Sequence, residues 1–556
     1  MKQEVAKILI EALKNLNLDI KEEEIEKYIE IPPSTDLGDY AFPCFFLAPM
    51  LKNDPHQIAI ELREKIGNTL GEFDEIQTQG PYINFFLNRK NLALNLIKEI
   101  LDKKEKYGSS NLGKGKKALI EHTSINPNAS PHVGRVRNAV IGDSLVKIFD
   151  FLNFKTEVHY YVNDVSKQIA MLVVAKAEKL SFDKMLKTYI DISKKVEKSK
   201  ELEQQVFSWL RRFEDGDKEA VRKFKKITET CVKGQKEILK RLDIHYHFFD
   251  YESSYIKKSK NILEELKKKK KLHKDKEGRL YLDQTNTFLR KMMKSAVLVL
   301  TRSDETGLYQ LRDLAYTIAK MKISDKNIVV LGEDQKLYFL QLKEALKLLS
   351  EKYPEVVHYS FILLSSHGKS RKMSTRKGDI VLLEDFLNDL TEKAEKEIKK
   401  RETKGDPEFI ANAAIKYKIL KNSPNKSINF DSNEALQFEG DTGPYLLYSY
   451  ARAKSILRKT EKFQDLNISK LEPKEIDLIK KLSQFPEIVL SSYNSLNPSL
   501  IANYSYQLAQ TFNEFYHTCP VIGSEQETFR LSLVKAFSQV LKNSLALLGI
   551  NVLEEM

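Results

Sequence analysis

Short apolar runs that alternate with stretches of helical periodicity fill the middle of the chain. Strands are expected at residues 118–120, 155–164, 327–332 and 356–365. Between them apolar residues recur every three or four positions, as in VGRVRNAVIGDSLVKIFDFL from Val133 onward. This alternation predicts an α/β fold with a parallel sheet and right-handed crossovers, a Rossmann-like core. Ligands of such sheets bind at the carboxyl ends of the strands, where we expect residues 121–135 and 332–335.

The two ends of the chain follow other patterns. Residues 2–16 have the spacing of an amphipathic helix, and residues 77–88 alternate as a strand does. Together they predict an N-terminal α+β domain over residues 1–112. Beyond residue 400 apolar residues recur at three and four positions along almost the whole chain, which predicts a C-terminal all-helical bundle over 400–556. One of its helices is expected over residues 478–493.

Residues 113–399, between the two end domains, are assigned to the α/β core. A charged segment interrupts this core. Residues 178–275 have helical periodicity and contain the single tryptophan of the chain, Trp209. We interpret this segment as a helical insertion between the two halves of the core. Its lysine run at 267–271 is more often a solvated surface than a nucleic-acid clamp.

Length and composition narrow the class of protein. A chain of 556 residues is too long for one core, so two to four domains are expected. The net charge of +13 suggests a polyanionic partner, with a surface simply covered by lysines as the equal alternative. No apolar run approaches membrane-spanning length, so no membrane association is expected. The three cysteines lie far apart and predict neither a disulfide framework nor a metal cluster, which fits a cytoplasmic protein.

The loop after the first core strand carries a candidate anion site. A strand, a turn containing His132 and Gly134, and a helix start follow one another there. The N-terminus of a helix offers unpaired N–H groups and the positive end of its dipole, and Gly134 lets a phosphate approach the backbone closely. By itself this arrangement is weak evidence for a phosphate site.

The longer string ALIEHTSINPNASPHVGRVRNAVIGDS, residues 118–144, is more specific. It resembles the first signature of the class I aminoacyl-tRNA synthetases, in the form that arginyl-tRNA synthetases use. The matching residues are Ser124, Asn126, Pro127, Pro131, His132, Gly134, Arg137, Gly142 and Asp143. One position departs from it, because Arg135 stands where the signature has its second histidine. The resemblance implies that His132, Gly134 and Arg135 act on the phosphates of ATP.

A second string, RKMSTRKGD at residues 371–379, resembles the other class I signature. The resemblance implies that Lys372 and Arg376 neutralise the pyrophosphate as it leaves, and that Ser374 hydrogen-bonds within the loop. Electrostatic stabilisation of this kind supplies much of the catalysis at phosphoryl-transfer sites. The apolar residues that follow, IVLLE at 380–384, predict a strand.

The stretch GLYQLRDLAYTIAKM offers a candidate pocket for an amino-acid side chain. Tyr309 and Asp313 are four positions apart and therefore share one face of a helix. The stretch resembles the segment of arginyl-tRNA synthetases that binds the side chain of arginine, a planar cation that a carboxylate can hold with paired hydrogen bonds. The resemblance implies that Asp313 pairs with the guanidinium and that Tyr309 packs beside it.

Other positions match the family's substrate contacts less directly. The resemblance implies that Asn126 and Gln335 hold the α-amino group, and that Glu121 and Ser124 also contact the substrate. Two residues after the second core strand, Asp164 and Gln168, form a second tier of candidates.

Both ends of the chain resemble tRNA-binding parts of the same family. LGDYAFP and GPYINFFL are similar to its N-terminal domain, and FEGDTGPYLLYSYARAKSILRK and VLKNSLALLGINVLEEM to its anticodon-binding bundle. The resemblance implies ATP-dependent ligation of L-arginine to its tRNA, with Mg²⁺ accompanying ATP, no protein-bound metal and a monomeric enzyme. Two alternatives remain open at this point: a non-catalytic tRNA-binding paralogue, motivated by Arg135, and a class I enzyme for another amino acid such as cysteine or glutamine.

Overall fold

A computed structural model describes residues 2–34, 37–67, 73–304, 306–349, 352–366, 369–371, 381–402, 404–459 and 468–556. The chain forms two compact units. The first comprises residues 1–104, 460–483 and 511–537, and the second comprises 105–459, 484–510 and 538–556. Among the helices in these described ranges, none has both the length and the apolar composition that crossing a bilayer needs.

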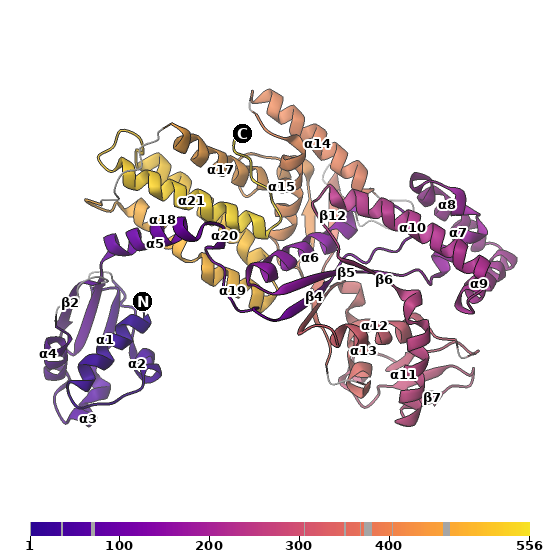
Figure 1. Ribbon diagram of the computed structural model, residues 1–556, viewed down its shortest axis with the longest axis horizontal. Coiled ribbons are helices and arrows are strands. Elements are labelled where there is room, and N and C mark those ends of the chain that lie inside the picture. Colours follow the sequence, from indigo (N-terminus) through magenta and orange to yellow (C-terminus); the bar gives the residue numbers. More distant parts are fainter. Residues whose placement is uncertain are drawn as a thin grey trace. The chain divides into compact units, whose positions relative to one another are not determined.

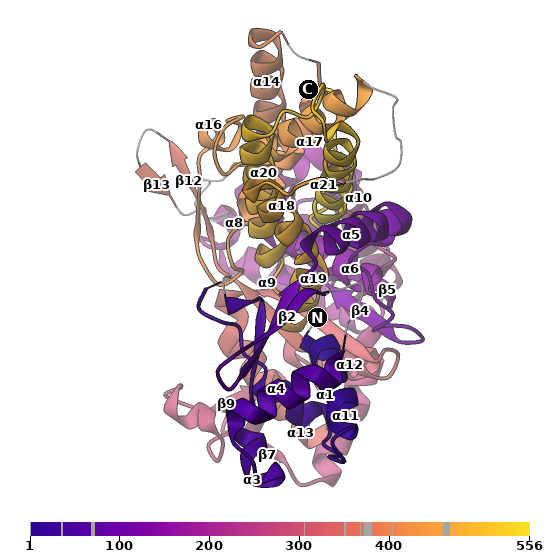
Figure 2. The ribbon, with the colours of Figure 1, turned by 90° about the vertical axis from the view of Figure 1, so that its left-hand side faces the viewer.

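The first unit contains a three-stranded antiparallel sheet in the order β1-β3-β2. Its strands are β1 (Tyr40–Pro43), β2 (Phe73–Gln79) and β3 (Tyr82–Leu87). Helix α4 packs on β2 and β3, and α1 packs on α4 (Figure 2). The single strand predicted over residues 77–88 is wrong: Gly80, with a φ of +58°, lies in a tight turn that divides this segment between β2 and β3.

The helices of the first unit cover its apolar residues. Val5, Leu9 and Leu13 on α1 are fully buried with Phe42 and Phe85 of the sheet. The helices that lie wholly in this unit are α1 (Lys2–Lys14), α2 (Glu22–Tyr28), α3 (Ala48–Leu51), α4 (Pro55–Ile66), α5 (Arg89–Lys103) and α18 (Pro473–Ser483). Helices α20 (Ser499–Thr518) and α21 (Glu527–Leu547) contribute residues to both units.

The second unit is built on a five-stranded sheet in the order β11-β10-β4-β5-β6, with every neighbouring pair parallel. Its strands are β4 (Lys117–Glu121), β5 (Lys155–Val162), β6 (Phe248–Tyr251), β10 (Lys326–Gly332) and β11 (Glu355–Tyr359). Helix α6 (Val133–Phe151) connects β4 to β5 and packs on β4, β5 and β10 (Figure 1). The predicted Rossmann-like parallel sheet is therefore confirmed.

Helix α6 is enclosed on nearly all sides, because α15 and α19 also pack on it. Every residue from Val136 to Val146 is buried. A Cβ on Gly142 would lie 2.2 Å from the ring of His122, which leaves no room for a side chain. This contact gives a structural reason for a glycine at that position.

The substitution Gly142→Ala is expected to destabilise the protein. The added methyl overpacks a rigid core, so we expect the free energy of unfolding to fall by about 2 kcal/mol. Urea denaturation followed by circular dichroism measures the change. The control is Gly115→Ala, where a Cβ meets nothing within 4 Å but the φ of +77° disfavours alanine. A Gly142→Ala protein no less stable than the control would contradict the packing argument.

The segment expected to be a helical insertion is only partly helical. Its helices are α8 (Phe182–Val196), α9 (Lys200–Glu214), α10 (Lys218–Lys240) and α11 (Ile256–Lys268). Together with α7 (Lys167–Val174), the first three form a separate core around Phe213 and Phe224. Strand β6, which lies inside the segment, is one of the two edge strands of the parallel sheet. The prediction of a wholly helical 178–275 is wrong because a run of only four strand residues is too short to show a period.

A second small sheet follows, in the order β7-β8-β9. Its antiparallel strands are β7 (Leu272–Lys274), β8 (Leu280–Asp283) and β9 (Val297–Val299). They share a core with α11, α12 (Tyr309–Met321) and α13 (Lys336–Leu349). This core supports the helix that carries Tyr309 and Asp313.

Three other predicted elements differ from the structure. The strand expected over 356–365 is divided between β11 and β12 (Ile362–Ser366), and β12 pairs with β13 (Lys369–Arg371) and β14 (Ile428–Phe430) in another sheet. The strand expected over 380–384 is wrong within the described residues, because Leu382 makes one isolated bridge and α14 (Leu383–Lys400) then begins. The helix expected over 478–493 is two helices, since α18 ends at Ser483 and Pro486 lies in the first turn of α19 (Phe485–Ser495).

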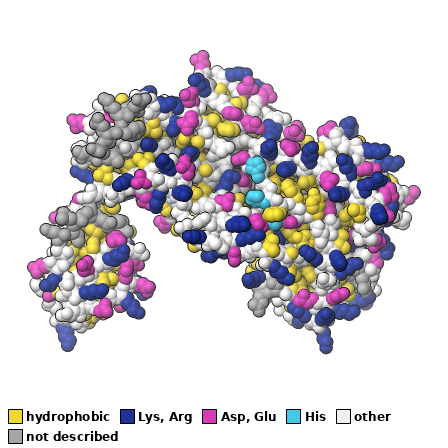
Figure 3. Space-filling model, in the orientation of Figure 1, with side chains coloured by type: hydrophobic (Ala, Val, Ile, Leu, Met, Phe, Trp, Pro, Cys, Tyr) yellow, Lys and Arg dark blue, Asp and Glu magenta, His cyan; other side chains and the backbone are white. Residues whose placement is uncertain are grey.

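The remaining helices of the second unit are α15 (Pro407–Leu420), α16 (Ser432–Ala435) and α17 (Gly443–Arg458). Helix α15 packs between α14 and α17. On the face drawn in Figure 3, lysines and arginines are interspersed with acidic residues over both units. The positive net charge of the chain is therefore not gathered into one continuous patch on that face.

Candidate active site

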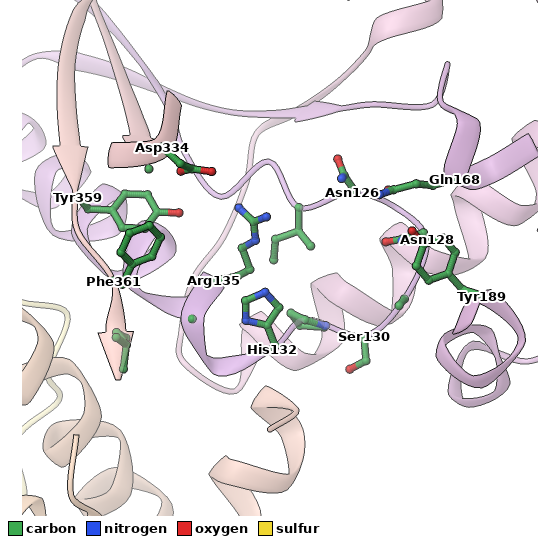
Figure 4. A pocket seen from close by; sticks show the side chains of 16 residues that line it. Asn126, Asn128, Ser130, His132, Arg135, Gln168, Tyr189, Asp334, Tyr359 and Phe361 are labelled. Carbon is green, nitrogen blue, oxygen red and sulfur yellow. The ribbon is translucent and has the colours of Figure 1, made fainter. Parts of the chain in front are cut away.

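A cavity of about 480 Å³ lies where the carboxyl ends of β4, β10 and β11 meet. The loop after β4 lines it with Asn126 and Asn128, and the first turn of α6 with Gly134 and Arg135. Figure 4 shows His132 and Arg135 between two groups of side chains, Asn126 and Gln168 on one side and Asp334, Tyr359 and Phe361 on the other. The position agrees with the rule that ligands bind beyond the carboxyl ends of parallel strands.

The turn before α6 is held by backbone hydrogen bonds to a distant segment. The N–H of Val133 donates to the carbonyl of Val381 at 3.0 Å, and the N–H of Leu383 donates to the carbonyl of Pro131 at 2.8 Å. Residues 381–383 begin two positions after the end of the second signature, residue 379. The residues of that signature expected to act in catalysis, Lys372, Ser374 and Arg376, lie outside the described residues.

His132 is the N-cap of α6 and keeps a neutral side chain. Burial, and to a lesser degree the positive charge of Arg135, lowers the pKa of His132 to about 4. Its Nδ1 is buried and has no hydrogen-bond partner among the described residues. Arg135 is exposed and extends the positive end of the helix dipole into the cavity. The site therefore combines a neutral imidazole and a permanent cation, which suits an anionic ligand.

The backbone between β4 and this turn adopts an unusual conformation. Thr123 and Ser124 have φ values of +76° and +42°, a region that costs a β-branched residue of order 1–3 kcal/mol. Side chains hold it there: Asn138 accepts from the N–H of Thr123 at 2.7 Å, and Tyr246 shares a 2.7 Å hydrogen bond with the Thr123 hydroxyl. The buried Oγ of Ser124 has no partner in the described part of the chain.

Arg137 connects α6 to the opposite wall of the cavity. Its side chain is fully buried, and its Nη1 donates to the carbonyl of Ser360 at 2.8 Å. Its Nη2 donates to the carbonyl of Ser423 at 3.2 Å. Because Ser360 lies between Tyr359 and Phe361, which both line the cavity, Arg137 positions that wall.

A second group of polar side chains surrounds Asp313, which is partly buried on α12. The hydroxyl of Tyr338 donates to Asp313 Oδ2 at 2.5 Å. Burial is the largest influence on this carboxyl and raises its pKa to about 6, against the lowering effect of Tyr338. Tyr309 is 47% exposed, and its ring centroid lies 5.4 Å from that of Tyr338. A carboxylate beside aromatic rings is a suitable site for a planar organic cation.

Glu252 is a candidate that the sequence did not reveal. It is 1% exposed, and its Oε2 has no hydrogen-bond partner among the residues described. Burial raises its pKa to about 8, with the nearby charge of Asp313 acting in the same direction. Its position directly after β6, at the carboxyl end of a parallel strand, is the signal that could have identified it. Treating residues 178–275 as an insertion hid that signal.

Other candidates have structural partners. Glu121 is buried and paired with the ammonium of Lys320, which also lies 4.2 Å from the centroid of the Tyr316 ring. Asp164 accepts from the N–H and the hydroxyl of Ser253 at 2.8 and 2.6 Å. Neither Glu121 nor Asp164 lines the cavity.

Two amides occupy different environments. Gln168 lines the cavity, and its buried Oε1 has no partner within the described ranges. Gln335 is exposed, and its amide donates to Asp334 at 3.4 Å.

The sequence also did not reveal Asp334, Tyr359 and Tyr338, because these residues have no recognisable spacing to the first signature. Asp334 lies four residues before Tyr338, so the turn from β10 to α13 connects the cavity to the surroundings of Asp313.

Three protein-family descriptions match the chain. Residues 2–87 match "Arginyl tRNA synthetase N terminal domain", residues 96–431 match "tRNA synthetases class I (R), catalytic domain", and residues 446–556 match "DALR anticodon binding domain". The second match alone spans more than half of the chain.

Curated relatives and solved structures that resemble the chain agree with these family matches. The chain is 36% identical to the arginine–tRNA ligase of Clostridium perfringens over 574 aligned positions, covering 99% of both chains. It is 37% identical to that of Methanocaldococcus jannaschii over 568 positions, covering 98% of both. The structure of the Thermus thermophilus arginyl-tRNA synthetase superimposes with a TM-score of 0.76 at 25% identity, covering 100% of both chains. The Plasmodium falciparum enzyme, at 22% identity and a TM-score of 0.71, covers 100% of this chain and 99% of its own and shares the fold.

Proposed function

The chain belongs to the arginyl-tRNA synthetases, class I enzymes that use ATP, and from this premise we propose how its residues carry out the reaction. Arginine is joined to the α-phosphate of ATP with release of pyrophosphate, and the arginyl group then passes to the terminal adenosine of its tRNA. The observation that carries this proposal is the turn from β10 to α13, in which Asp334 lines the cavity at the α6 N-terminus and Tyr338, four residues later, donates a hydrogen bond to the carboxyl of Asp313.

ATP is assigned to the cavity. The neutral imidazole of His132 donates a hydrogen bond to the α-phosphate as negative charge builds up, Gly134 leaves room for the nucleotide, and Arg135 binds the triphosphate. Lys372 and Arg376 neutralise the departing pyrophosphate, and Ser374 orders their loop; these three roles rest on the sequence. Mg²⁺ arrives bound to ATP, and the Asp334 carboxylate on the cavity wall suits a cation that keeps most of its ligands from phosphate and water.

Arginine is assigned to the space around Asp313. Asp313 and the unpartnered oxygen of Glu252 receive the guanidinium, and Tyr309 packs beside it. Asn126 and Gln335 are proposed to hold the α-amino group, with Ser124 and Gln168 beside the substrate. Asn126 and Gln168 line the cavity, whereas the roles of Ser124 and Gln335 rest on the sequence. Glu121, which is paired with the ammonium of Lys320, is also proposed to contact the substrate.

The tRNA is assigned to the segments that precede and follow the catalytic domain in the sequence. We place the N-terminal tRNA-contacting domain at residues 1–112, the catalytic domain at 113–399 and the anticodon-binding domain at 400–556. The DALR match supports the last of these assignments. Binding of this polyanion is expected to weaken as salt rises. We further propose a monomer that acts in the cytoplasm.

Arginine-dependent ATP–pyrophosphate exchange, measured with and without tRNA, tests the function. Exchange that depends on arginine in the presence of tRNA is the expected result, while cysteine and glutamine give none. No exchange in either condition would instead support a tRNA-binding paralogue whose chemistry was lost with the second signature histidine. Exchange driven by another amino acid would overturn the arginine assignment.

Arginine binding is expected to weaken as pH falls. The pKa values of Asp313 and Glu252 are raised to about 6 and about 8, so lower pH protonates the carboxylates that must face the guanidinium. The KM for arginine should therefore rise about 10-fold between pH 8.5 and pH 6.5. Initial rates of aminoacylation at saturating ATP and tRNA measure it.

The raised pKa values of Asp313 and Glu252 also determine how the stability of the fold depends on pH. Because both folded-state pKa values exceed the ordinary carboxyl values of 3.8 and 4.5, their contribution to folding is fully present below those ordinary values. It is lost as pH rises to about 6 for Asp313 and to about 8 for Glu252. Bound arginine should restore this lost stability. The increase in Tm caused by arginine should therefore be larger at pH 8.5 than at pH 6.5. An arginine KM that is constant over this range would contradict the assignment.

A further inference from the structure

Arg312 is next to Asp313 on α12 and is one of the most buried charged groups in the second unit, with 4% of its surface exposed. Its Nε donates to Glu252 Oε1 at 2.5 Å. Its Nη1 donates to the carbonyl of Gly307 at 2.7 Å, two residues before α12 begins. One guanidinium thus connects the carboxylate after β6 with the start of the helix that carries Asp313.

A carboxylate from the helical segment completes this arrangement. Glu214 is the last residue of α9, and its side chain is 8% exposed. Its Oε1 lies 3.7 Å from Arg312 Nη1, and both of its oxygens accept from Arg302 Nη1 at 3.2 and 3.0 Å. Helix α9 therefore reaches Arg312, the neighbour of Asp313, through the acidic side chain of Glu214.

The arrangement leaves a specific part of the site free. Arg312 occupies one oxygen of Glu252, whereas Oε2 has no partner within the described part of the chain. The bond to Gly307 fixes the entry into α12, and with it the position of Asp313 one residue beyond Arg312. Ion pairs with this degree of burial depend strongly on each partner, because removing one leaves an uncompensated charge.

We propose that Arg312 is a positioning residue of the arginine pocket, and that Glu214 makes helix α9 part of the support of that pocket. Arg312 does not contact arginine in this assignment. It orients Glu252 and the first turn of α12, so that the free oxygen of Glu252 and the carboxyl of Asp313 face one substrate. The inference rests on the proposed assignment of arginine to Asp313.

If Arg312 had a purely structural role, it would stabilise the fold without altering the charge of the pocket. The charged groups around Glu252 and Asp313 distinguish this role from the positioning role proposed here. Glu252 is influenced by Arg312, Asp313 and Asp164, and Asp313 by Tyr338, Glu121, Tyr161 and Arg312. In each set Arg312 is the one cation that lowers the carboxyl pKa. Its removal should therefore raise both pKa values further, and the pH dependence of arginine binding should move with them.

Aminoacylation by the full-length protein, with arginine, ATP and tRNA each varied, tests the proposal. For Arg312→Gln we expect the KM for arginine to rise about 30-fold while the KM for ATP stays within about twofold. The rise in arginine KM at low pH should begin about one pH unit higher than in the parent. Arg312→Lys should restore the pH profile, because it keeps the charge, and only part of the affinity, because it lacks the two-point geometry.

Glu214→Gln tests the contribution of α9 and should raise the KM for arginine about threefold. The control is Arg212→Gln, on the same helix, which breaks exposed pairs with Asp217 and Glu219 and should leave both KM values unchanged. Thermal unfolding shows whether each variant folds; if Arg312→Gln does not, Arg312→Lys and Glu214→Gln decide the question.

Three results would overturn the inference. They are a parallel rise of both KM values in Arg312→Gln, an unaltered pH profile, and a Glu214→Gln protein with the parental arginine KM. The Asp313→Asn variant tests the underlying assignment of arginine to Asp313 separately. If that assignment is wrong, this variant leaves the KM for arginine unchanged. Loss of arginine binding in Asp313→Asn together with a parental Arg312→Gln protein overturns this inference alone.

Discussion

Asp313→Asn should lower kcat/KM for arginine about 1000-fold, mainly through KM. The substitution removes the charge that would pair with the guanidinium but keeps an oxygen that can accept from Tyr338. The fold is therefore expected to survive, and ATP affinity to remain within about twofold. Steady-state aminoacylation and arginine-dependent pyrophosphate exchange both measure the effect.

The control for this prediction is Asp389→Asn, which alters an exposed carboxylate paired with Lys393 on α14. It should behave as the parent in both assays. The two proteins should also differ in ligand stabilisation: arginine should raise the Tm of the control and leave that of Asp313→Asn unchanged. If kcat and the KM for arginine barely move in Asp313→Asn, the guanidinium lies elsewhere and the pocket assignment is wrong.

His132→Ala should lower kcat about 100- to 1000-fold and leave the KM for arginine nearly unchanged. The reason is that a hydrogen bond to the α-phosphate gains strength as charge develops there, whereas arginine does not contact this side chain. His132→Gln keeps an N–H donor and should retain part of the rate. Single-turnover formation of arginyl-adenylate in the presence of tRNA separates this step from product release.

The ionisation of His132 supplies a second test of its proposed role at the α-phosphate. Because burial holds its pKa near 4, the imidazole is neutral throughout the working range and should add no inflection to the kcat profile between pH 6 and pH 9. His245→Ala, at an exposed histidine beside Asp243, is the matched control and should keep the parental rate. Equal losses of activity in the two alanine variants, or a parental rate in His132→Ala, would show that His132 does not act on the phosphate.

Much of the fold follows from local pattern. The parallel strands β4, β5 and β10 and helix α6 lie where apolar runs and helical periodicity place them, because these patterns reflect which face of each element is buried. The spacing of Tyr309 and Asp313 likewise predicts the helical segment on which both lie. Strand β6 escaped detection because four residues between long helices carry too little periodicity, and the hairpin of β2 and β3 because its turn is only two residues long.

The candidate site depends more on tertiary structure. His132, Gly134 and Arg135 are contiguous with a helix start, so the sequence alone places them together at one anion site. The partners of the carboxylates are not local: Lys320 is 199 positions from Glu121, and Arg312 is 60 positions from Glu252. No spacing rule connects residues so far apart.

By itself, the sequence determined the family, the parallel-sheet core and the chemical types at the site, because periodicity and contiguous motifs are properties of short segments. Only the tertiary structure decided which buried acids already have a cation and which keep an oxygen free for a ligand. The physical reason is that the ionisation and pairing of a buried carboxylate depend on desolvation and on charges brought close by packing, and neither is encoded in its neighbours along the chain.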